Sequence, residues 1–245
     1  MGFKAKGYDR DVSTKERDCS LFAIACEGAE TEPNYFKYFE YFKRIKVDII
    51  THEESPDTYD TETYNKNNKS APKYVLQKAQ DYLEKYGLDL SNKDSLWLVI
   101  DVDQWEKSSI QEVYEKAKSQ NINLIISNPC FEIWLLFHWC DNLDKIDCSK
   151  STILKKELNK LKDDKFCHID FLKDINKAII NAKKADQNID YYWPEERTSK
   201  VYILAEQLMN KIGYNAYQKF IEITLPKLRE EIRLKGKINY PINTL

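Results

Sequence analysis

Four short apolar runs alternate with stretches of helical periodicity over the first part of the chain. The runs cover residues 21–26, 46–51, 95–100 and 122–126, and polar residues flank each of them. Apolar runs of this length are typical of strands that are buried on both faces of a sheet. Apolar positions recur at helical spacing in residues 34–44, 72–86, 109–119 and 133–140. This alternation predicts an α/β fold with a parallel four-stranded sheet that is sandwiched by helices.

Glycine and proline mark the ends of several predicted elements. Gly87 follows the helix predicted at residues 72–86 and is expected to close it. Pro129 is expected to be the first residue of a helix that Asn128 caps. Gly28 follows the first strand directly, where it allows a turn that a residue with a side chain would resist.

After residue 148 the pattern becomes helical only. Helices are predicted at residues 150–161, 169–184, 199–211 and 217–234, with Thr198 or Ser199 as the cap of the third. We therefore divide the chain into a flexible leader (1–19), an α/β core (20–148) and an all-helical C-terminal extension packed on that core (149–245). Residues 52–71 are polar and lack periodicity, which predicts a long surface loop.

The composition is consistent with the predicted fold and also indicates the cellular compartment. The chain has 245 residues, and 42% of them are hydrophobic, which is enough for a large core. We find no apolar run of about 18 residues that would span a membrane, and no export signal. The six cysteines form no C-x-x-C pair and are interpreted as reduced thiols of a cytoplasmic protein. A zinc site built from Cys140, Cys148, Cys167 and His168 is a minor alternative, because the spacing is irregular.

Charge is divided unevenly along the chain. The net charge is only −2, but acidic residues outnumber basic ones in residues 1–148, and the reverse holds in residues 149–245. An acidic part beside a basic part is typical of a metal site next to a surface that binds a polyanion. The alternative is that the lysines simply solvate helices, since they are spread along the sequence.

Carboxylates follow three of the four predicted strands. Glu27 follows the first strand, Asp101 and Asp103 follow the third, and Glu132 follows the fourth. The carboxyl ends of parallel strands meet at one edge of a sheet, so these side chains are expected to lie close together. Clustered carboxylates repel one another unless a cation lies among them, and oxygen ligands favour Mg²⁺ or Mn²⁺. Glu32, at the opening of the next helix, is expected to reach the same ion.

Each acid alone also has an ordinary explanation. Aspartate in a loop often caps a turn, and Glu132 in a first helical turn favours the helix dipole. Asp-x-Asp also holds nucleotide sugars in metal-dependent glycosyltransferases, and some phosphatases have an aspartate nucleophile where this chain has Glu27. The sequence contains no P-loop and no G-x-S-x-G motif. His138, in an apolar helix, is expected to be a core residue and not a base.

Several blocks of sequence together resemble the RloB-like family. They read Glu27-Gly28-x-x-Thr31-Glu32-Pro33-x-Tyr35-Phe36, then Asp101-x-Asp103, then Ser127-Asn128-Pro129-x-Phe131-Glu132-x-Trp134-Leu135-Leu136, and finally Thr198-Ser199-x-Val201-Tyr202-x-Leu204. The resemblance spans about residues 20–210. It implies a Toprim-related protein of a bacterial anti-phage system, often encoded beside an ATPase of the SMC/AAA kind.

The Toprim resemblance also implies roles for individual residues. Glu27 matches the glutamate after the first strand, and Asp101 with Asp103 matches the D-x-D motif after the third. Glu132 matches an additional acid of Toprim nucleases of the overcoming-lysogeny type. Those nucleases carry another acid four residues after the glutamate, where this chain has Thr31 followed by Glu32. They also use a downstream lysine, for which the candidates are Lys183, Lys184 and Lys200.

The sequence therefore predicts a metal-dependent nuclease that acts on RNA, tRNA included, or on DNA, as the effector of abortive infection. Glu27, Asp101, Asp103 and Glu132 are the predicted catalytic residues. The predicted contacts to the nucleic-acid backbone are Lys183, Lys184, Arg197 and Lys200. The alternative is an inactive Toprim-like adaptor that works with a partner ATPase through residues 52–71 and 191–193. A metal-dependent nucleotidyl or glycosyl transferase is a third hypothesis, and the sequence leaves open whether the chain forms a homo-oligomer.

Overall fold

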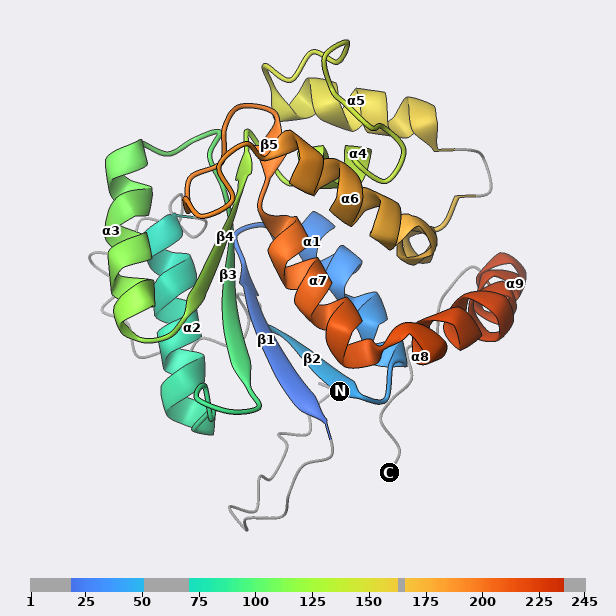
Figure 1. The fold of residues 1–245 in the computed structure, drawn as a ribbon, viewed down its shortest axis with the longest axis horizontal. Helices are drawn as coiled ribbons and strands as arrows, with labels where there is room; N and C mark the ends of the chain where they lie inside the picture. The colour runs from blue at the N-terminus through green and yellow to red at the C-terminus, as the bar shows by residue number, and fades with distance from the viewer. Residues whose placement is uncertain (1–18, 51–70, 163–165, 236–245) are drawn as a thin grey trace, which may run out of the picture.

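The computed structural model describes residues 19–50, 71–162 and 166–235. Within them one sheet of five strands has the order β2-β1-β3-β4-β5 (Figure 1). The strands are β1 (Ser20–Cys26), β2 (Ile45–Ile50), β3 (Ser95–Asp101), β4 (Asn123–Asn128) and β5 (Thr198–Ser199). The first four are parallel, and β5 pairs antiparallel with β4. The predicted α/β fold is confirmed, with one strand more than predicted. The predicted leader, except Cys19, and almost all of the predicted loop 52–71 lie outside the described residues.

Helices cover both faces of the sheet (Figure 1). Helices α2 (Pro72–Tyr86) and α3 (Lys107–Ser119) lie on one face, where they pack on Ala23 and Ala25 of β1. Phe22 and Ile24 alternate with these alanines and belong to the larger core on the other face. Gly87 closes α2 in the left-handed conformation (φ 58°), as predicted. None of the described helices is long and apolar enough to cross a membrane.

Nearly half of the buried residues of the larger core come from the C-terminal helices. These are α5 (Ser151–Leu161), a 3-10 helix (His168–Asp174), α6 (Ile175–Ala185), α7 (Val201–Ile212), α8 (Tyr214–Lys219), a π-helical turn (Phe220–Thr224) and α9 (Leu225–Lys235). The extension is not all helical as predicted, because β5 belongs to it. The Ser127 and Ser199 hydroxyls lie 2.9 Å apart, and the Lys200 N–H donates to the carbonyl oxygen of Ile126 (2.8 Å). A strand of two residues is too short to give a recognisable sequence pattern, so the sequence predicted only a helix cap at Thr198 or Ser199.

The first helix after β1 differs from the prediction in its type. Helix α1 (Thr31–Phe36) opens beside Glu32, as expected, ahead of the periodic stretch 34–44, and it continues as a 3-10 helix (Lys37–Tyr41). Phe36, Phe39 and Phe42 are all buried. A 3-10 helix places residues three apart on one side, so the tighter winding buries this aromatic series together.

The segment after β4 also departs from the prediction. Helix α4 (Glu132–Leu136) is shorter than the predicted 133–140, and Asn128 does not cap it, since its Nδ2 donates to the carbonyl oxygen of Pro194 (3.1 Å). The Asn128–Pro129 peptide bond is cis. The carbonyl oxygen of Pro129 accepts the N–H groups of Val102 (2.9 Å) and Asp103 (3.0 Å). These bonds join the loop after β3 to the loop after β4.

Candidate functional site: an acidic cavity at the strand ends

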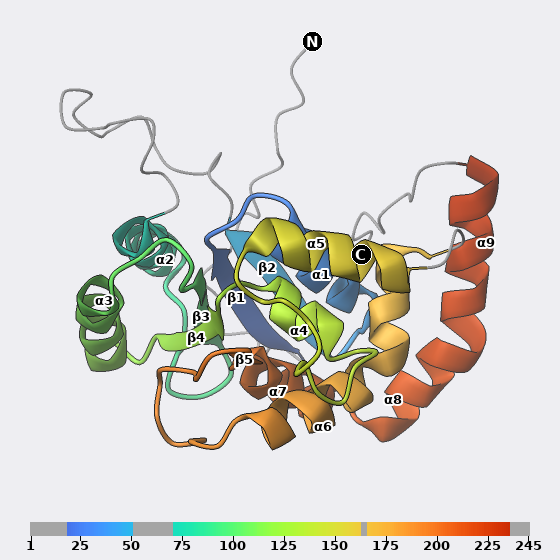
Figure 2. The same ribbon diagram turned by 90° about the horizontal axis from the view of Figure 1, so that it is seen from above.

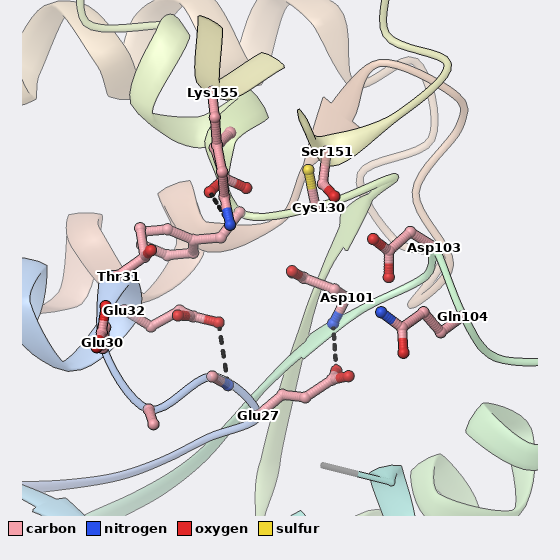
Figure 3. A pocket seen from close by; sticks show the side chains of 14 residues that line it. Glu27, Glu30, Thr31, Glu32, Asp101, Asp103, Gln104, Cys130, Ser151 and Lys155 are labelled. Carbon is pink, nitrogen blue, oxygen red and sulfur yellow. Dashed lines mark hydrogen bonds and ion pairs between the residues drawn. The ribbon is translucent and has the colours of Figure 1, made fainter. Parts of the chain in front are cut away.

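A cavity of about 300 Å³ lies at the carboxyl ends of β1 and β3 (Figure 3). Residues from the starts of α1, α4 and α5 complete its wall. All five acids predicted from the sequence line it, namely Glu27, Glu32, Asp101, Asp103 and Glu132. The topology therefore brings together carboxylates that are up to about a hundred residues apart in the chain.

Glu27 is the most firmly held of these acids. Its Oε2 accepts the backbone N–H of Asp101 (2.9 Å), and its Oε1 accepts the indole N–H of Trp105 (2.7 Å). The carboxyl group is buried, and burial raises its pKa to about 7, although the two hydrogen bonds oppose this. Glu27 therefore changes its protonation state near neutral pH.

Glu32 reaches back from α1 to the turn after β1. Its Oε1 accepts the Gly28 N–H at 3.2 Å. A Cβ atom on Gly28 would lie 2.7 Å from the same oxygen, which is closer than real Cβ contacts. The absence of a side chain at Gly28 therefore permits this close approach of Glu32, in addition to the turn that the sequence analysis considered. Burial, followed by the charge of Glu132, raises the pKa of Glu32.

Asp101 and Asp103 occupy different depths of the cavity (Figure 3). Asp101 ends β3 and is partly buried, and its Oδ1 has no hydrogen-bond partner in the structure. Burial and then the charges of Glu32, Glu27 and Glu132 raise its pKa well above the ordinary value. Asp103 is exposed, and its pKa is raised by partial desolvation and by Glu132, against a hydrogen bond with Ser151.

Glu132 connects the cavity to α5. It opens α4 and is buried, and its Oε1 lies 3.6 Å from Nζ of Lys155. Helix α5 lies across α1 and α4 when the molecule is seen from above (Figure 2), and it packs on α4. This packing explains why a lysine from the C-terminal part of the chain faces acids from the core.

The five acids surround the cavity without meeting at one point. No group of three or more His, Cys, Asp or Glu side chains in the described residues is arranged to hold a metal ion. Three of the carboxylates are turned toward donors of the protein itself: Glu27 toward Asp101 and Trp105, Glu32 toward Gly28, and Glu132 toward Lys155. A shared cation would require some of these side chains to rotate.

Comparison with families of known proteins identifies the family of this chain. The model of the family described as RloB-like protein matches residues 22–208, which include every acid of the cavity. The chain belongs to the RloB-like family. Searches of curated proteins and of solved structures found no match.

Four residues of this RloB-like chain that the sequence analysis missed belong to the site. Ser151 and Lys155 line the cavity, and Trp105 holds Glu27. Lys78 of α2 lies behind the cavity, only 6% exposed, and its Nζ donates to the carbonyl oxygen of Cys26 (3.0 Å). Burial lowers the pKa of Lys78, against the charges of Cys26, Glu27 and Glu32. The sequence does contain a feature that could have identified Lys78, because it lies three residues after Val75 on the apolar side of α2.

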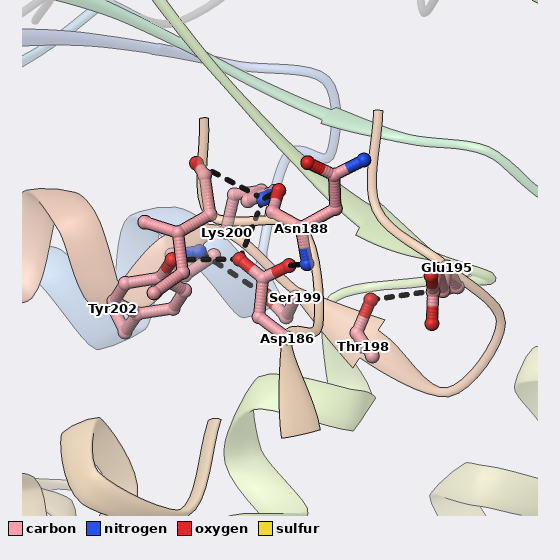
Figure 4. A network of polar contacts seen from close by, with 9 residues as sticks. Asp186, Asn188, Glu195, Thr198, Ser199, Lys200 and Tyr202 are labelled. Atoms are coloured by element: carbon pink, nitrogen blue, oxygen red, sulfur yellow. Dashed lines mark hydrogen bonds and ion pairs between the residues drawn. The ribbon is translucent and has the colours of Figure 1, made fainter. Parts of the chain in front are cut away.

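The predicted nucleic-acid contacts lie away from the cavity, and none of them lines it. Lys183 pairs with Glu206 (2.8 Å), Lys184 is exposed, and Arg197 is exposed with its Nη1 donating to the carbonyl oxygen of Asp144 (3.4 Å). Lys200 is only 2% exposed and pairs with Asp186 (2.5 Å; Figure 4). The ammonium group of Lys200 therefore does not face solvent in this structure, because it is paired inside the protein.

His138 and the cysteines fit the ordinary interpretations of the sequence. His138 is buried beside Tyr35, with Nε2 3.3 Å from the tyrosine hydroxyl, and burial lowers its pKa to about 3. It therefore stays neutral at physiological pH. All six cysteines are free thiols, and the alternative zinc site finds no support, because the described residues include no such metal-holding group.

Replacing Glu27 by Gln is expected to stabilise the metal-free protein more at pH 8 than at pH 5. A carboxyl group whose pKa rises to about 7 on folding contributes stability that is present below its unfolded pKa and lost as the pH rises through 7. The benefit of Gln over Glu should therefore grow by about 2–3 kcal/mol between these pH values. Urea unfolding of both proteins in EDTA measures it. Gln also lacks one hydrogen-bond acceptor, but this loss changes the free energy of unfolding by the same amount at pH 5 and at pH 8. A stability difference between the two proteins that does not depend on pH would therefore contradict the raised pKa.

Replacing Gly28 by Ala is expected to displace the Glu32 carboxylate and break its bond to the Gly28 N–H. The loss should be about 1–2 kcal/mol in the free energy of unfolding, since a tight contact and a hydrogen bond are both affected. Thermal unfolding measures it, and Ala29→Ser at the adjacent exposed position is the control. A variant as stable as the parent protein would show that Glu32 does not depend on this approach.

Proposed function

We propose that this chain is a metal-dependent nuclease with a Toprim-like active site in the acidic cavity. The observation that carries the proposal is the convergence of five carboxylates at the strand ends of a mostly parallel sheet. The unpartnered Oδ1 of Asp101 and the raised pKa values of Glu27, Glu32, Asp101 and Asp103 indicate negative charge that the protein does not neutralise itself. Function is often the reason for such uncompensated charge.

The donor set fits Mg²⁺ or Mn²⁺ by its chemistry, because every candidate ligand is a carboxylate oxygen. Asp101, Asp103 and Glu132 would hold the cation, with Glu32 within reach of the same cavity. When bound, the cation supplies Lewis-acid polarisation of the phosphate.

The protein's own groups would position water and move its proton. Glu27 has a pKa near 7, which suits a group that accepts a proton from an attacking water at neutral pH. The Asp101 N–H and the Trp105 indole hold its carboxylate in place, so the base keeps one orientation. Lys155, on the wall of the cavity, would attract the phosphate that the carboxylates alone repel.

The test is cleavage of DNA and of tRNA by purified protein in Mg²⁺ or in Mn²⁺. Wild-type protein is expected to cut one of the two, and Glu27→Gln and Asp103→Asn are each expected to lose the activity. Cleavage that survives both substitutions would exclude this assignment. Which of the two nucleic acids is cleaved also decides the substrate class. An anti-phage role is then tested by phage challenge of cells that carry the same variants.

The second candidate is a Toprim-like adaptor that is inactive by itself and works with an ATPase of the SMC/AAA kind. The observation that favours it is the turning of Glu27, Glu32 and Glu132 toward donors of the protein. It predicts that divalent cations do not raise the melting temperature at all, whereas the nuclease predicts a rise that grows with occupancy.

A further inference from the structure

One side of helix α5 carries a line of polar and basic side chains that leads away from the cavity. Ser151, Lys155 and Asn159 follow one another at intervals of four residues, so they share one side of the helix, and Lys162, the residue directly after the helix, continues the line through its contact with Asn159. We call these four residues the α5 stripe. Leu154 and Leu158 are buried and fix α5 to the core, so the stripe has a defined orientation.

The near end of the α5 stripe belongs to the cavity wall. Ser151 and Lys155 both line the cavity, and the Lys155 side chain is still 58% exposed although its Nζ lies 3.6 Å from Glu132. Among the described residues, Lys155 is the only Lys or Arg on that wall. Because the Lys155 side chain is largely exposed and its Nζ is not in close contact with Glu132, the ammonium group can also face an anion in the cavity.

The far end of the stripe is Lys162, which lies close to Asn159 and to the ring of Phe166. Lys162 Nζ donates to Asn159 Oδ1 (3.4 Å) and lies 5.5 Å from the centre of the Phe166 ring. Desolvation lowers the pKa of His168, and the charges of Lys162 and Lys37 lower it further, which favours the neutral imidazole. The charge of Glu132 acts on both Lys155 and Lys162. Lys155 and Lys162 thus place two positive charges along α5, the first of them on the cavity wall.

We propose that the α5 stripe binds the phosphodiester backbone of a nucleic-acid strand and guides it into the acidic cavity. The proposal rests on the nuclease function proposed above and names the surface that holds the substrate. An acidic cavity repels a polyanion, so binding requires cations beside it, and the stripe supplies them at the right place. Lys155 and Lys162 are roughly 10 Å apart along the α5 axis, so the two ammonium groups can contact different phosphates of one strand.

The α5 stripe is a better candidate than the α6 surface that the sequence predicted. On α6, Lys183 is engaged by Glu206, and the buried Lys200 nearby is engaged by Asp186. None of the α6 lysines lines the cavity. A strand bound on α6 would thus need another contact to bring its phosphate to the acids.

The experiment measures binding without cleavage. Anisotropy of a fluorescein-labelled single-stranded RNA and of a labelled DNA duplex is recorded in EDTA over a range of salt concentrations. Lys155→Gln/Lys162→Gln is expected to weaken binding about tenfold at low salt and to reduce the slope of log K against log salt by about 1 to 2. Lys155→Arg/Lys162→Arg should keep the wild-type slope, because the charges remain. Lys183→Gln/Lys184→Gln is the matched control on α6 and should bind as wild type does.

Each result decides the proposal. Unchanged binding by the α5 variant, loss of binding by the α6 variant instead, or no binding by wild type would overturn it. Melting temperatures show whether the variants are folded, and both α5 lysines are at least partly exposed. The nuclease assignment fails separately, if wild type binds nucleic acid through α5 but never cleaves it in Mg²⁺ or Mn²⁺.

Discussion

Replacing Lys200 by Met is expected to lower the free energy of unfolding by about 3–5 kcal/mol, because it leaves a buried carboxylate without its countercharge. Lys200 and Asp186 are both at most 2% exposed, and their Nζ and Oδ2 atoms lie 2.5 Å apart. The ammonium group also donates to the carbonyl oxygen of Asn188 (2.7 Å), and the Tyr202 hydroxyl donates to Asp186 Oδ2 (2.6 Å; Figure 4). A loss of this size is a large share of the stability of an ordinary domain.

Two further variants separate the broken pair from the loss of the lysine itself. Lys200→Met/Asp186→Leu removes both charges and should recover much of the stability, because apolar residues often replace a buried ion pair at little cost. Lys183→Met, which removes a lysine from the half-exposed pair with Glu206, should cost less than about 1 kcal/mol. Urea unfolding at pH 7 measures all three. A cost under 1 kcal/mol for Lys200→Met would show that Asp186 finds another partner.

The site was predictable from the sequence where it depends on local pattern and sheet topology. Apolar runs located β1 and β3 to within a residue or so, and the acids that follow them had to meet at one edge because the strands are parallel. Glu27, Asp101 and Asp103 were found in this way. Glu132, which follows the fourth strand, was found by the same reasoning, and the cavity contains it too.

The parts that were missed depend on contacts between distant segments. No pattern within α5 indicates that it packs over α4, so the place of Lys155 on the cavity wall could not be derived. The two residues of β5 and the buried Lys200 follow from pairing with β4, which the sequence does not encode locally. Lys78 is different, since a lysine on the apolar side of α2 was visible and was overlooked.

Replacing Asp101 by Asn is expected to abolish cleavage and, in the absence of metal, to make the protein more stable. The charge removed is one that Glu32, Glu27 and Glu132 repel and whose Oδ1 has no partner. Residues placed for function commonly cost stability, so the neutral amide should raise the melting temperature in EDTA. Substitution of a residue that only supports a metal ligand commonly lowers metal affinity about 10–100-fold. Substitution of a direct ligand should therefore lower it by at least about 100-fold.

The two effects are measured together by thermal unfolding with and without Mn²⁺. Wild type should gain about 2.7 kcal/mol when the free cation is 100 times its Kd, whereas Asp101→Asn should gain almost nothing at the same concentration. Adding metal therefore narrows or reverses the difference in melting temperature between the two proteins. Asp94→Asn is the matched control, because Asp94 is also buried but directly precedes the opposite end of β3. It should lose stability and keep the full response to Mn²⁺. If Asp101→Asn instead loses stability in EDTA and still responds to Mn²⁺, Asp101 supports the fold and the cation is held by other residues of the cavity.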